Sequence, residues 1–591
     1  MLRFLREVFA SALGVLIAGL IVLFLIIGGM PAGPLEGVPE RAVLVLDPSL
    51  PYVDNPVPIS VGDLVFGGGE TSRVPLARVR DALRAAAQDE RIVGLELTGV
   101  VAPMGWASLS ALRAEIVRFA ASGKPVMADF ARYDEDAIYL ASAAAQVYLP
   151  PLGEVEWNGS AAELEYLARA LELAGIEVQV TRVGEYKSAV EPYLDQQMSA
   201  ANREQIQTIL QQQEDALLAA VAEGRALEDE SALRAALRED GLLAPDRAAE
   251  LGLVDGVRYW DEVAGELRDW TGDDGAGEDG DLAYSNISLE EYLLDPVCAP
   301  DEFLAGATVA VVYAEGDVVD GGGPGQVAAN ELVPQLAALR EDEEVAAVVL
   351  RINSPGGSAS ASEFILREVE LLAAEKPLIV SMGDVAASGG YWIAARANEI
   401  YADPGTITGS IGVFSMFPNI ATLADRLGVD IETVETGPHA GMFSFYRPLA
   451  PETLAIFQAS VDRVYEDFLT RVAAGRGLER DAVHAIAQGR VWTGRDAQTL
   501  GLVDELGGLP AAIQRAADLA GLKEGYATWH LYHEQDEWEA LLDSWLREAD
   551  PLAQLPVDGL TARARTVLRA CSRAQNARGV WARLPFELRR K

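Results

Sequence analysis

Ser388 lies in a setting that suits a nucleophile. It stands within AASGGY, from Ala386 to Tyr391, directly after an apolar run of strand type. Small residues on both sides permit the sharp turn on which nucleophilic serines are presented. Small residues also let helices pack closely on sheets, so the turn alone leaves both interpretations of Ser388 open.

A serine hydroxyl needs a base, and Lys187 is one candidate. It lies within GEYKSAVEP, from Gly184 to Pro192, in a chain with five lysines against forty-two arginines. Burial would lower the pKa of this lysine by up to ~3–5 units, because desolvation favours the neutral amine, which can accept a proton. His439 is the alternative base, since no histidine precedes it in the chain. An ordinary surface lysine is the structural alternative for Lys187.

The two halves of the chain resemble each other at a nearly constant offset. Lys376 to Tyr391 matches Lys124 to Tyr139, 252 residues earlier. The motif GLVD closes each half, from Gly252 to Asp255 and again from Gly501 to Asp504. The chain therefore contains an internal duplication that covers nearly the whole body.

Each half lacks one of the candidate catalytic groups. The first half has Asp136 at the position of Ser388, and the second half has Ala440 at the position of Lys187. Each half therefore has the candidate group that the other half lacks. We therefore expect the two halves to fold together and build one site from both.

A glycine pair follows a predicted buried strand in the second half. Gly356 and Gly357 lie within LRINSPGGS, from Leu350 to Ser358, ahead of a predicted helix. Backbone N–H groups there can approach a carbonyl oxygen and form an oxyanion hole, a contribution of about 10²–10³ in rate per donor. The first half has Pro103-Met104-Gly105 instead, so one glycine is missing. Such pairs are common in turns and are weak evidence alone.

Alternating strand and helix patterns predict two α/β domains. A chain of 591 residues exceeds the ~250–300 residues at which single cores stop growing. Each half opens with a short apolar run, then returns to strand pattern after a helical segment, which is typical of βαβ units in a mostly parallel sheet. The expected strands are Ala42–Leu46, Val126–Ala128, Val309–Tyr313 and Leu378–Ser381, and the expected helices are Leu112–Ala121 and Phe364–Ala374.

Five motifs stand in a fixed order along the chain. They are YKSA followed by Glu191-Pro192, NSPGG at 353–357, DVAASGGY at 384–391, TGSIG at 408–412 and GRVWTG at 489–494. Together they resemble signal peptide peptidase A, long form, and the similarity covers about residues 40 to 520 and the apolar N-terminal segment. It implies a tandem duplication of a Clp protease/crotonase-like βαβ domain and a Ser/Lys serine peptidase without a cofactor.

The resemblance also implies roles for single residues. Ser388 would be the nucleophile, Lys187 the general base and Ser410 the residue that orients the base. The amides of Gly389 and of the pair Gly356 and Gly357 would form the oxyanion hole. Family members assemble as bowl-shaped tetramers and degrade signal peptides left after cleavage of exported proteins, so a homo-tetramer acting on apolar peptides is expected.

The N-terminus predicts a single membrane anchor. Val8 to Met30 is almost wholly apolar, long enough at ~1.5 Å per residue to cross a hydrocarbon core of ~30 Å. A cleaved signal peptide is the alternative, but its apolar region would be shorter. Arg3 and Arg6 precede the run, so we expect the N-terminus in the cytoplasm and the catalytic body outside the bacterial inner membrane, in the periplasm.

Five segments follow from these observations. They are an N-terminal stub with the anchor at 1–36, a first repeat at 37–270, an acidic linker and connection at 271–300, a second repeat at 301–525, and a C-terminal extension at 526–591. From Thr561 onward this extension carries eight arginines and Lys591 against Glu587 alone. Such a tail suits an acidic subunit surface, a solvated helix face or anionic lipid.

Charge and composition narrow the function classes. A net charge of −43 disfavours nucleic acid, because phosphates would be repelled over most of the surface. Cys298 and Cys571 give no disulfide framework, and the four histidines form no metal-ligand motif. Two alternatives to a peptidase stay open: an inactive scaffold that binds peptides on the same fold, and a crotonase-type acyl-CoA enzyme that uses the same glycine donors.

Overall fold

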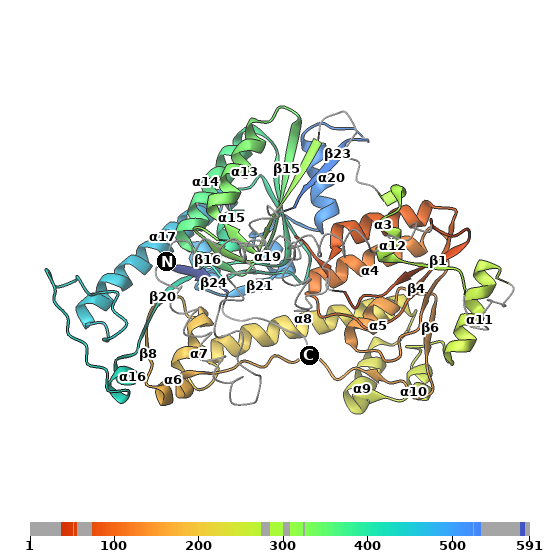
Figure 1. Cartoon of the computed structure of the whole chain (residues 1–591), viewed down its shortest axis with the longest axis horizontal. Coiled ribbons are helices and arrows are strands. Elements are labelled where there is room, and N and C mark those ends of the chain that lie inside the picture. Colours follow the sequence, from red (N-terminus) through yellow and green to blue (C-terminus); the bar gives the residue numbers. More distant parts are fainter. Residues whose placement is uncertain are drawn as a thin grey trace, which may run out of the picture.

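The computed structural model describes residues 37–50, 52–55, 74–273, 284–298, 308–322, 325–523, 525–532 and 580–584. Within these ranges the chain forms two α/β units side by side, with the first repeat at the right of Figure 1 and the second at the upper left. The long helix α8 (Ala200–Gly224) runs beneath both units. The two repeats are therefore joined along one side of the molecule.

The first repeat is built on a sheet in which every pairing is parallel. Its strand order is β10-β6-β5-β4-β1-β11. The strands are β1 (Ala42–Leu46), β4 (Ile92–Leu97), β5 (Val126–Ala128), β6 (Gln146–Leu149), β10 (Gly256–Val257) and β11 (Asn286–Ser288). The helices are α3 (Leu76–Gln88), α4 (Trp106–Ala120), α5 (Glu135–Ala141), α6 (Ala168–Ala174), α7 (Glu191–Leu194), α9 (Glu230–Asp240), α10 (Pro245–Glu250), α11 (Trp260–Thr271) and α12 (Leu289–Tyr292). Two short pairs, β2 (Tyr52–Val53) with β3 (Val74–Pro75) and β7 (Val155–Glu156) with β9 (Leu242–Leu243), lie beside it.

The second repeat has the same architecture with longer central strands. Its order is β21-β19-β17-β15-β12-β23, and β18 and β22 extend from β17. The strands are β12 (Thr308–Glu315), β15 (Val345–Ser354), β17 (Leu378–Ala387), β18 (Glu399–Ala402), β19 (Ile407–Gly409), β21 (Val491–Thr493), β22 (Glu505–Leu506) and β23 (Ala527–Leu531). The helices are α13 (Ala329–Glu341), α14 (Ala359–Glu375), α15 (Gly389–Ala394), α16 (Ala421–Arg426), α17 (Pro451–Arg476), α18 (Arg480–Ile486), α19 (Gly494–Thr499) and α20 (Leu509–Leu519).

A third sheet joins the repeats. Its order is β14-β13-β16-β24-β20-β8, so it takes β8 from the first repeat and the other strands from the second repeat and the C-terminal extension. The strands are β8 (Glu177–Val183), β13 (Asp317–Val319), β14 (Gln326–Ala328), β16 (Gly356–Ser358), β20 (Val413–Asn419) and β24 (Trp581–Arg583). The antiparallel pairing of β8 with β20 extends over seven residue pairs. This pairing fixes the segment after β8 against the second repeat.

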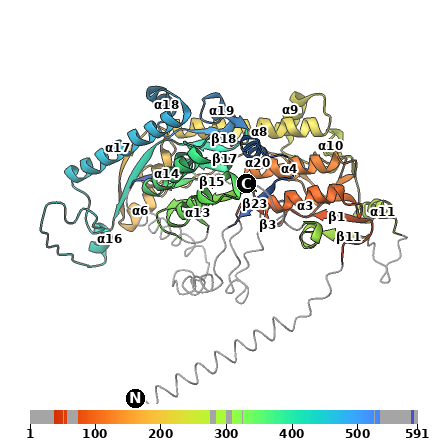
Figure 2. The ribbon, with the colours of Figure 1, turned by 90° about the horizontal axis from the view of Figure 1, so that it is seen from above.

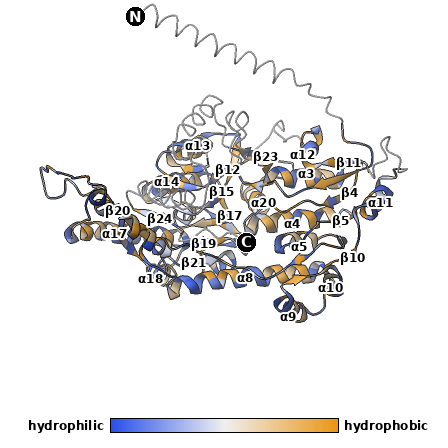
Figure 3. Ribbon diagram, turned by 60° about the horizontal axis from the view of Figure 1, so that its bottom comes forward, coloured by the Kyte–Doolittle hydropathy of each residue, from blue (hydrophilic) through white to orange (hydrophobic). Residues whose placement is uncertain are grey.

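Each repeat has its own apolar core. The sheet strands are rich in β-branched residues, and those of β1 and β12 are almost fully buried between helices. Hydrophobic colour follows the strands in Figure 3, whereas the helices show both colours because one face meets solvent. The elements that carry chemistry therefore rest on rigid, doubly covered sheets.

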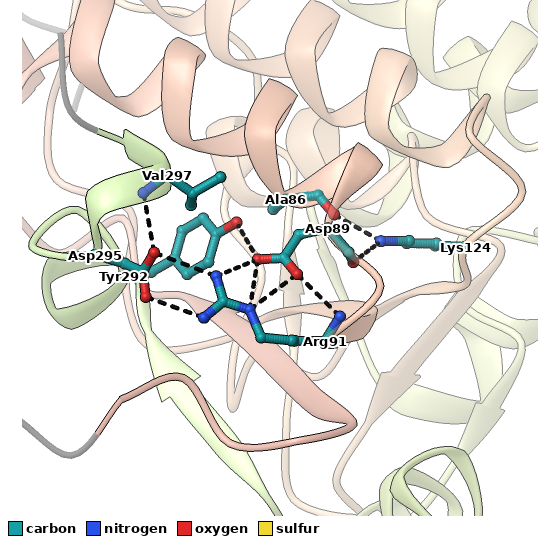
Figure 4. A network of polar contacts seen from close by, with 7 residues as sticks. All are labelled: Ala86, Asp89, Arg91, Lys124, Tyr292, Asp295 and Val297. Carbon is teal, nitrogen blue, oxygen red and sulfur yellow. Dashed lines mark hydrogen bonds and ion pairs between the residues drawn. The ribbon is translucent and has the colours of Figure 1, made fainter.

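Matched polar contacts show that the duplication extends to structural detail. Lys124 donates hydrogen bonds to the carbonyl oxygens of Ala86 and Asp89 at the end of α3, as Figure 4 shows. Lys376 makes the same contacts to Leu339 and Asp342 at the end of α13. A lysine that satisfies the last carbonyls of a helix supports the helix C-terminus. Lys124 and Lys376 therefore have the same structural role, one in each repeat.

Several predicted elements differ from the observed ones in length. β1 and β5 have the predicted bounds, whereas β12 and β17 are longer than predicted. The prediction missed the ends of these two strands because they carry polar or small residues and lack an apolar pattern. β11 lies beyond residue 270, and β23 lies beyond residue 525, where the two repeats were predicted to end. Each adds the last strand to its sheet by pairing with the opening strand of the repeat.

The predicted anchor, Val8 to Met30, lies outside the described residues. Among the residues that are described, no helix is both long and apolar enough to span a bilayer.

Candidate active site

Ser388 occupies a strained turn between β17 and α15. Its φ of 56° and ψ of −112° are unusual for a residue with a side chain, and such a conformation costs about 1–3 kcal/mol. The amide of Ser388 donates to the carbonyl of Gly409 at 2.8 Å, and its carbonyl accepts from Trp392 at 2.8 Å. These bonds to β19 and α15 hold the turn and fix the side chain at the end of the strand.

Lys187 comes from the first repeat and meets Ser388 inside the protein. It follows β8 and precedes the short 3₁₀ turn Ser188–Val190. Its Nζ lies 2.8 Å from Ser388 Oγ, 3.0 Å from Ser410 Oγ and 3.1 Å from the Ser410 carbonyl oxygen. Both Lys187 and Ser388 have no exposed surface. The structure thus brings together the two groups that the sequence places in different repeats.

Burial favours the neutral form of the Lys187 amine. Desolvation lowers the pKa of this amine well below its usual value. Its hydrogen-bond partners are oxygens of two serines, which are neutral and do not offset the loss of water. The neutral form, which can accept a proton, therefore persists to lower pH than it does for a lysine in water.

The backbone of Ser410 is held beside the Lys187 amine. Ser410 also has a left-handed backbone, with φ of 51°, and its amide donates to the Arg490 carbonyl at 2.7 Å. Arg490 lies in the turn before β21, within the GRVWTG motif. Its guanidinium lies 4.8 Å from the ring centre of Tyr186, the neighbour of Lys187. Two motifs of the second repeat therefore enclose the lysine of the first.

Gly489 lets the chain approach the lysine closely. A Cβ at Gly489 would lie 2.6 Å from Lys187 Cβ and 2.7 Å from its backbone nitrogen. Its φ of 78° also favours glycine. This close approach explains the glycine in GRVWTG, because the backbone there packs directly against Lys187.

The alternative base lies elsewhere. His439 is exposed, in the segment between α16 and α17, whereas Ser388 is fully buried. The exposed position of His439 gives it no part in the site. His439 is adjacent to Ala440, the residue of the second repeat that corresponds to Lys187, and Ala440 is exposed as well.

The amides of the glycine pair and of Gly389 converge beside Ser388. The nitrogen of Gly389 lies 2.6 Å from the point where a Cβ of Gly356 would stand, and the nitrogen of Gly357 lies 3.0 Å from the corresponding point on Gly389. The amide of Gly356 donates to Ser354 Oγ at 3.1 Å. Because the Gly356 amide is engaged by Ser354, the amides of Gly357 and Gly389 remain as the candidate oxyanion donors.

The first repeat has a filled counterpart of this glycine loop. Helix α4 begins at Gly105 without a side-chain cap of its own. Asp384 of β17 enters the loop instead: one carboxylate oxygen accepts from the Ser108 amide at 2.9 Å and the other from Ser108 Oγ at 2.7 Å. A Cβ at Gly105 would lie 2.1 Å from the Asp384 carboxyl carbon. The lost oxyanion loop thus serves as a contact between repeats.

Sequence reasoning missed the structural role of Asp384. The signal was present, because Asp384 stands four residues before Ser388 in the motif DVAASGGY, but only the fold shows its partner. A buried ion pair lies nearby, between Arg351 of β15 and Asp54 of the first repeat, with Nε and Oδ2 3.0 Å apart. β17, which leads to Ser388, and its neighbour β15 are therefore each tied to the first repeat by a buried polar side chain.

Asp136, which takes the place of Ser388 in the first repeat, has no equivalent role. It lies buried in the first turn of α5, after the cap residue Asp134, whose side chain accepts from the Ala137 amide at 2.8 Å. A carboxylate in the first turn of a helix is favoured by the helix dipole. The position therefore supports the helix that begins there.

Comparison with known proteins identifies the family. Residues 118–272 and 370–523 match the model of Peptidase family S49, one segment in each repeat, and together they span just over half of the chain. The chain belongs to peptidase family S49. It is a serine peptidase, so its reaction is the hydrolysis of peptide bonds. The Clp protease model matches residues 306–403, which include the glycine pair and Ser388.

Full-length relatives agree with the family assignment. Protease 4 of Salmonella typhi is 36% identical over 516 residues, 84% of this chain and 81% of the relative. Protease 4 of Haemophilus influenzae is 36% identical over 76% of this chain and 73% of the relative. The chloroplastic serine protease SPPA of Arabidopsis thaliana is 32% identical over 76% of this chain and 66% of the relative. The predicted resemblance to signal peptide peptidase A is confirmed at the level of the family.

Proposed function

We propose that this S49 peptidase is a membrane-anchored endopeptidase that uses Ser388 and Lys187 as a dyad. The observation that carries the proposal is the distance of 2.8 Å between Lys187 Nζ and Ser388 Oγ inside a site without exposed surface. Lys187 accepts the proton of Ser388, whose Oγ attacks the peptide carbonyl and forms an acyl-enzyme. The amine then returns the proton to the leaving group.

Backbone donors would stabilise the charge that develops on the carbonyl oxygen. The amides of Gly357 and Gly389 converge beside Ser388, and neither needs to move during the reaction. Lys187 then activates the water that hydrolyses the ester, and Ser410 keeps the amine oriented through both halves of the reaction. The proton transfers use Lys187 Nζ, Ser388 Oγ and Ser410 Oγ, which already lie in hydrogen-bond range.

We propose apolar peptides, including cleaved signal peptides, as substrates. A hollow of about 410 Å³ lies between α8, α9 and the segment after Trp157. Its lining includes Met198, Ile206 and Leu210, which also pack near Ala387, the residue before the nucleophile. Polar side chains such as Arg203 and Glu214 also line the hollow, so its apolar residues would take the large side chains of a peptide while its polar residues meet the backbone.

The proposed location is the bacterial inner membrane, with the catalytic body on the periplasmic side. The apolar run from Val8 to Met30 and the arginines before it support this orientation. Proximity to the membrane would give the site access to signal peptides, which are themselves apolar segments.

We also propose a homo-oligomer, with four copies as in the family. β8, β20, α16 and α17 form an arm that projects away from the first repeat, as Figures 1 and 2 show. Large apolar side chains on this arm are exposed, among them Val434 at 99% and Leu427 at 71%. Such side chains favour contact with a second copy. A Val434→Asp chain should show a lower mass in sedimentation, and an unchanged mass would exclude this surface.

One experiment tests the proposed chemistry. The full chain in detergent should cleave a synthetic apolar peptide and should be labelled by a fluorophosphonate at Ser388, with labelling lost in Lys187→Ala. Ser360→Ala is the matched control, because Ser360 is an exposed serine that bonds Asp320 and should leave labelling unchanged. Full peptide hydrolysis by Ser388→Ala would exclude the dyad.

The same experiment separates the two alternatives. An inactive scaffold would bind the peptide without releasing product. A crotonase-type enzyme would act on an acyl-CoA without Ser388 or Lys187. The contact between these two residues favours the peptidase, because neither alternative needs a buried neutral amine against a serine.

A further inference from the structure

The segment that carries Lys187 is attached to the second repeat at two points. On its N-terminal side, the amide of Tyr186 donates to the carbonyl of Gln488 at 2.9 Å. The second point is a side chain of α8, the long helix that runs beneath both repeats in Figure 1. That side chain belongs to Gln205, which is 1% exposed. A buried glutamine outside both catalytic motifs therefore takes part in bringing the two halves of the site together.

The amide group of Gln205 contacts both repeats at once. Its Oε1 accepts a hydrogen bond from the Val491 amide, at the start of β21, at 3.2 Å. Its Nε2 lies 3.2 Å from Ser188 Oγ and 3.4 Å from the Tyr186 carbonyl oxygen. A backbone N–H only donates, so the bond from Val491 fixes which end of the amide faces each repeat. Gln205 therefore connects the residues on both sides of Lys187 to the second repeat.

A chain of buried polar groups holds the amide of Gln205 in turn. Asn202, one turn earlier on α8, accepts from Gln205 Nε2 at 3.0 Å and donates from its Nδ2 to Glu191 Oε2 at 3.2 Å. The same carboxylate oxygen accepts from the Ser199 amide at 3.3 Å, where α8 begins. Asn202 and Glu191 are both buried. Because a carboxylate accepts, Glu191 fixes the orientation of Asn202 and, through it, that of Gln205.

The partner of Gln205 in the second repeat lies next to the contacts of the nucleophile. Val491 pairs with Gly409 across β21 and β19, and the Gly409 carbonyl accepts from the Ser388 amide at 2.8 Å. Val491 is buried, so its amide would lose its acceptor without Gln205. Gln205 therefore holds the lysine segment against the strands that hold the turn of Ser388.

We propose that Gln205 positions Lys187 for proton transfer with Ser388. The inference rests on the proposed dyad and adds to it a residue that acts through the chain on both sides of the lysine. An amide is uncharged, so it holds the lysine segment without favouring the protonated form of the amine. Proton transfer needs the two groups in hydrogen-bond range, and a misplacement of about 1 Å lowers a rate by about 10²-fold.

Fluorophosphonate labelling of Ser388 in the full chain, measured against pH, tests this proposal. The labelling rate depends on removal of the Ser388 proton and needs no knowledge of the natural peptide. Gln205→Met keeps the length of the side chain and removes its hydrogen bonds. Labelling per folded molecule should slow by about ten- to a hundredfold across the pH range. Hydrolysis of a synthetic apolar peptide should lose kcat with little change in KM.

Gln212→Met is the matched control on the same face of α8, about two turns after Gln205. Gln212 also bonds the second repeat, since it accepts from Thr493 Oγ1 at 2.6 Å and donates to Asp496 Oδ2 at 3.0 Å. These partners lie at the start of α19 rather than beside the lysine segment. Gln212→Met should lower stability without slowing the labelling of folded molecules. Charged groups near the amide of Gln205 are the same in every variant: Glu191, Glu204 and Arg490.

Gln205→Glu separates positioning from a general loss of stability. Its carboxylate can still accept from the Val491 amide and from Ser188 Oγ, so the maximal labelling rate at high pH should stay near that of wild type. A negative charge near the amine favours its protonated form and should raise the pKa of Lys187. The rise of the labelling rate with pH should therefore move to higher pH, by about one unit. A side chain that only stabilises the fold would leave this pH profile unchanged.

The outcomes separate this inference from the proposed dyad. If Lys187→Ala loses labelling while Gln205→Met is labelled as fast as Gln212→Met, the positioning role is wrong and the dyad stands. If Gln205→Met does not fold, the pH profile of Gln205→Glu decides, and a profile equal to that of wild type contradicts the role. If Lys187→Ala is labelled as fast as wild type, the dyad itself fails.

Discussion

The two repeats share their scaffold and differ in their chemistry. In both, an arginine at the C-terminal end of the long helix contacts the aspartate of the GLVD motif, Arg225 after α8 with Asp255 and Arg476 of α17 with Asp504. The second repeat adds Ser388 and a complete glycine loop, whereas the first adds Lys187. Each repeat needs its own scaffold contacts, so these contacts occur twice. Each candidate catalytic group occurs in one repeat, so the two repeats together form one candidate site.

The two glycine loops differ in how the helix that follows each of them is capped. In the second repeat, α14 begins with its own cap, since Ser358 Oγ accepts from the Ala361 amide at 3.3 Å. In the first repeat, α4 begins at Gly105 and takes its cap from Asp384 of the other repeat. The second loop carries the candidate oxyanion donors beside Ser388, whereas the first docks the repeats through Ser108 and Asp384.

The largest expected effect separates the catalytic lysine from the structural ones. Lys187→Met should lower peptide hydrolysis by about 10³-fold or more, because Ser388 loses its base. Lys376→Met should leave the rate per folded molecule nearly unchanged, because Lys376 only bonds carbonyls at the end of α13. Steady-state rates, corrected for the folded fraction, measure both. Equal loss in the two variants would contradict the distinct roles of the repeats.

A smaller effect concerns the contact between repeats. Asp384→Ala should destabilise the docking of α4 by about 1.5–3 kcal/mol, since two hydrogen bonds from Ser108 to a carboxylate are lost. Denaturant unfolding with probes in each repeat measures this loss.

A double-mutant cycle with Ser108→Ala tests whether the loss comes from this contact. The two substitutions should be far from additive, because they remove the same interaction. Asp320→Ala is the matched control, because Asp320 bonds the Ser358 and Ser360 hydroxyls at the start of α14. If it separates the repeats as much as Asp384→Ala does, the docking role of the lost loop is wrong.

The smallest effect is a pH slope in stability. The pKa of Lys187 is lowered by burial in the folded chain and lies near ~10.4 in the unfolded chain. Between these two values the unfolded state holds a proton that the folded state lacks, so the free energy of unfolding rises with pH there, by up to about 1.4 kcal/mol per pH unit. Below the folded pKa the slope vanishes. Activity should rise with pH through the same lowered pKa.

Unfolding measured from pH 5 to 10 should show the slope in wild type and its absence in Lys187→Met. Lys124→Met is the comparison variant in the first repeat. It should change the pH slope less than Lys187→Met does, because Lys124 is less buried, its pKa is lowered to a smaller extent, and its Nζ bonds two carbonyl oxygens. A wild-type slope unchanged in Lys187→Met would show that other groups cause it.

The sequence by itself determined the elements and the duplication. Apolar runs such as Ala42–Leu46 can only be buried strands between helices, and the offset between Lys124 and Lys376 identifies two copies of one unit. The candidate site residues could also be identified from the sequence, because AASGGY and GEYKSAVEP are local motifs. The complementary vacancies indicated that both halves were needed.

Only the tertiary structure decided which groups meet. Lys187 and Ser388 are 201 residues apart in sequence, and the pairing of β8 with β20 brings them together. The lowered pKa of Lys187 exists only when the fold excludes water from it. The capping of α4 by Asp384 and the place of β24 beside Gly357 likewise depend on contacts between distant segments, which no local pattern encodes.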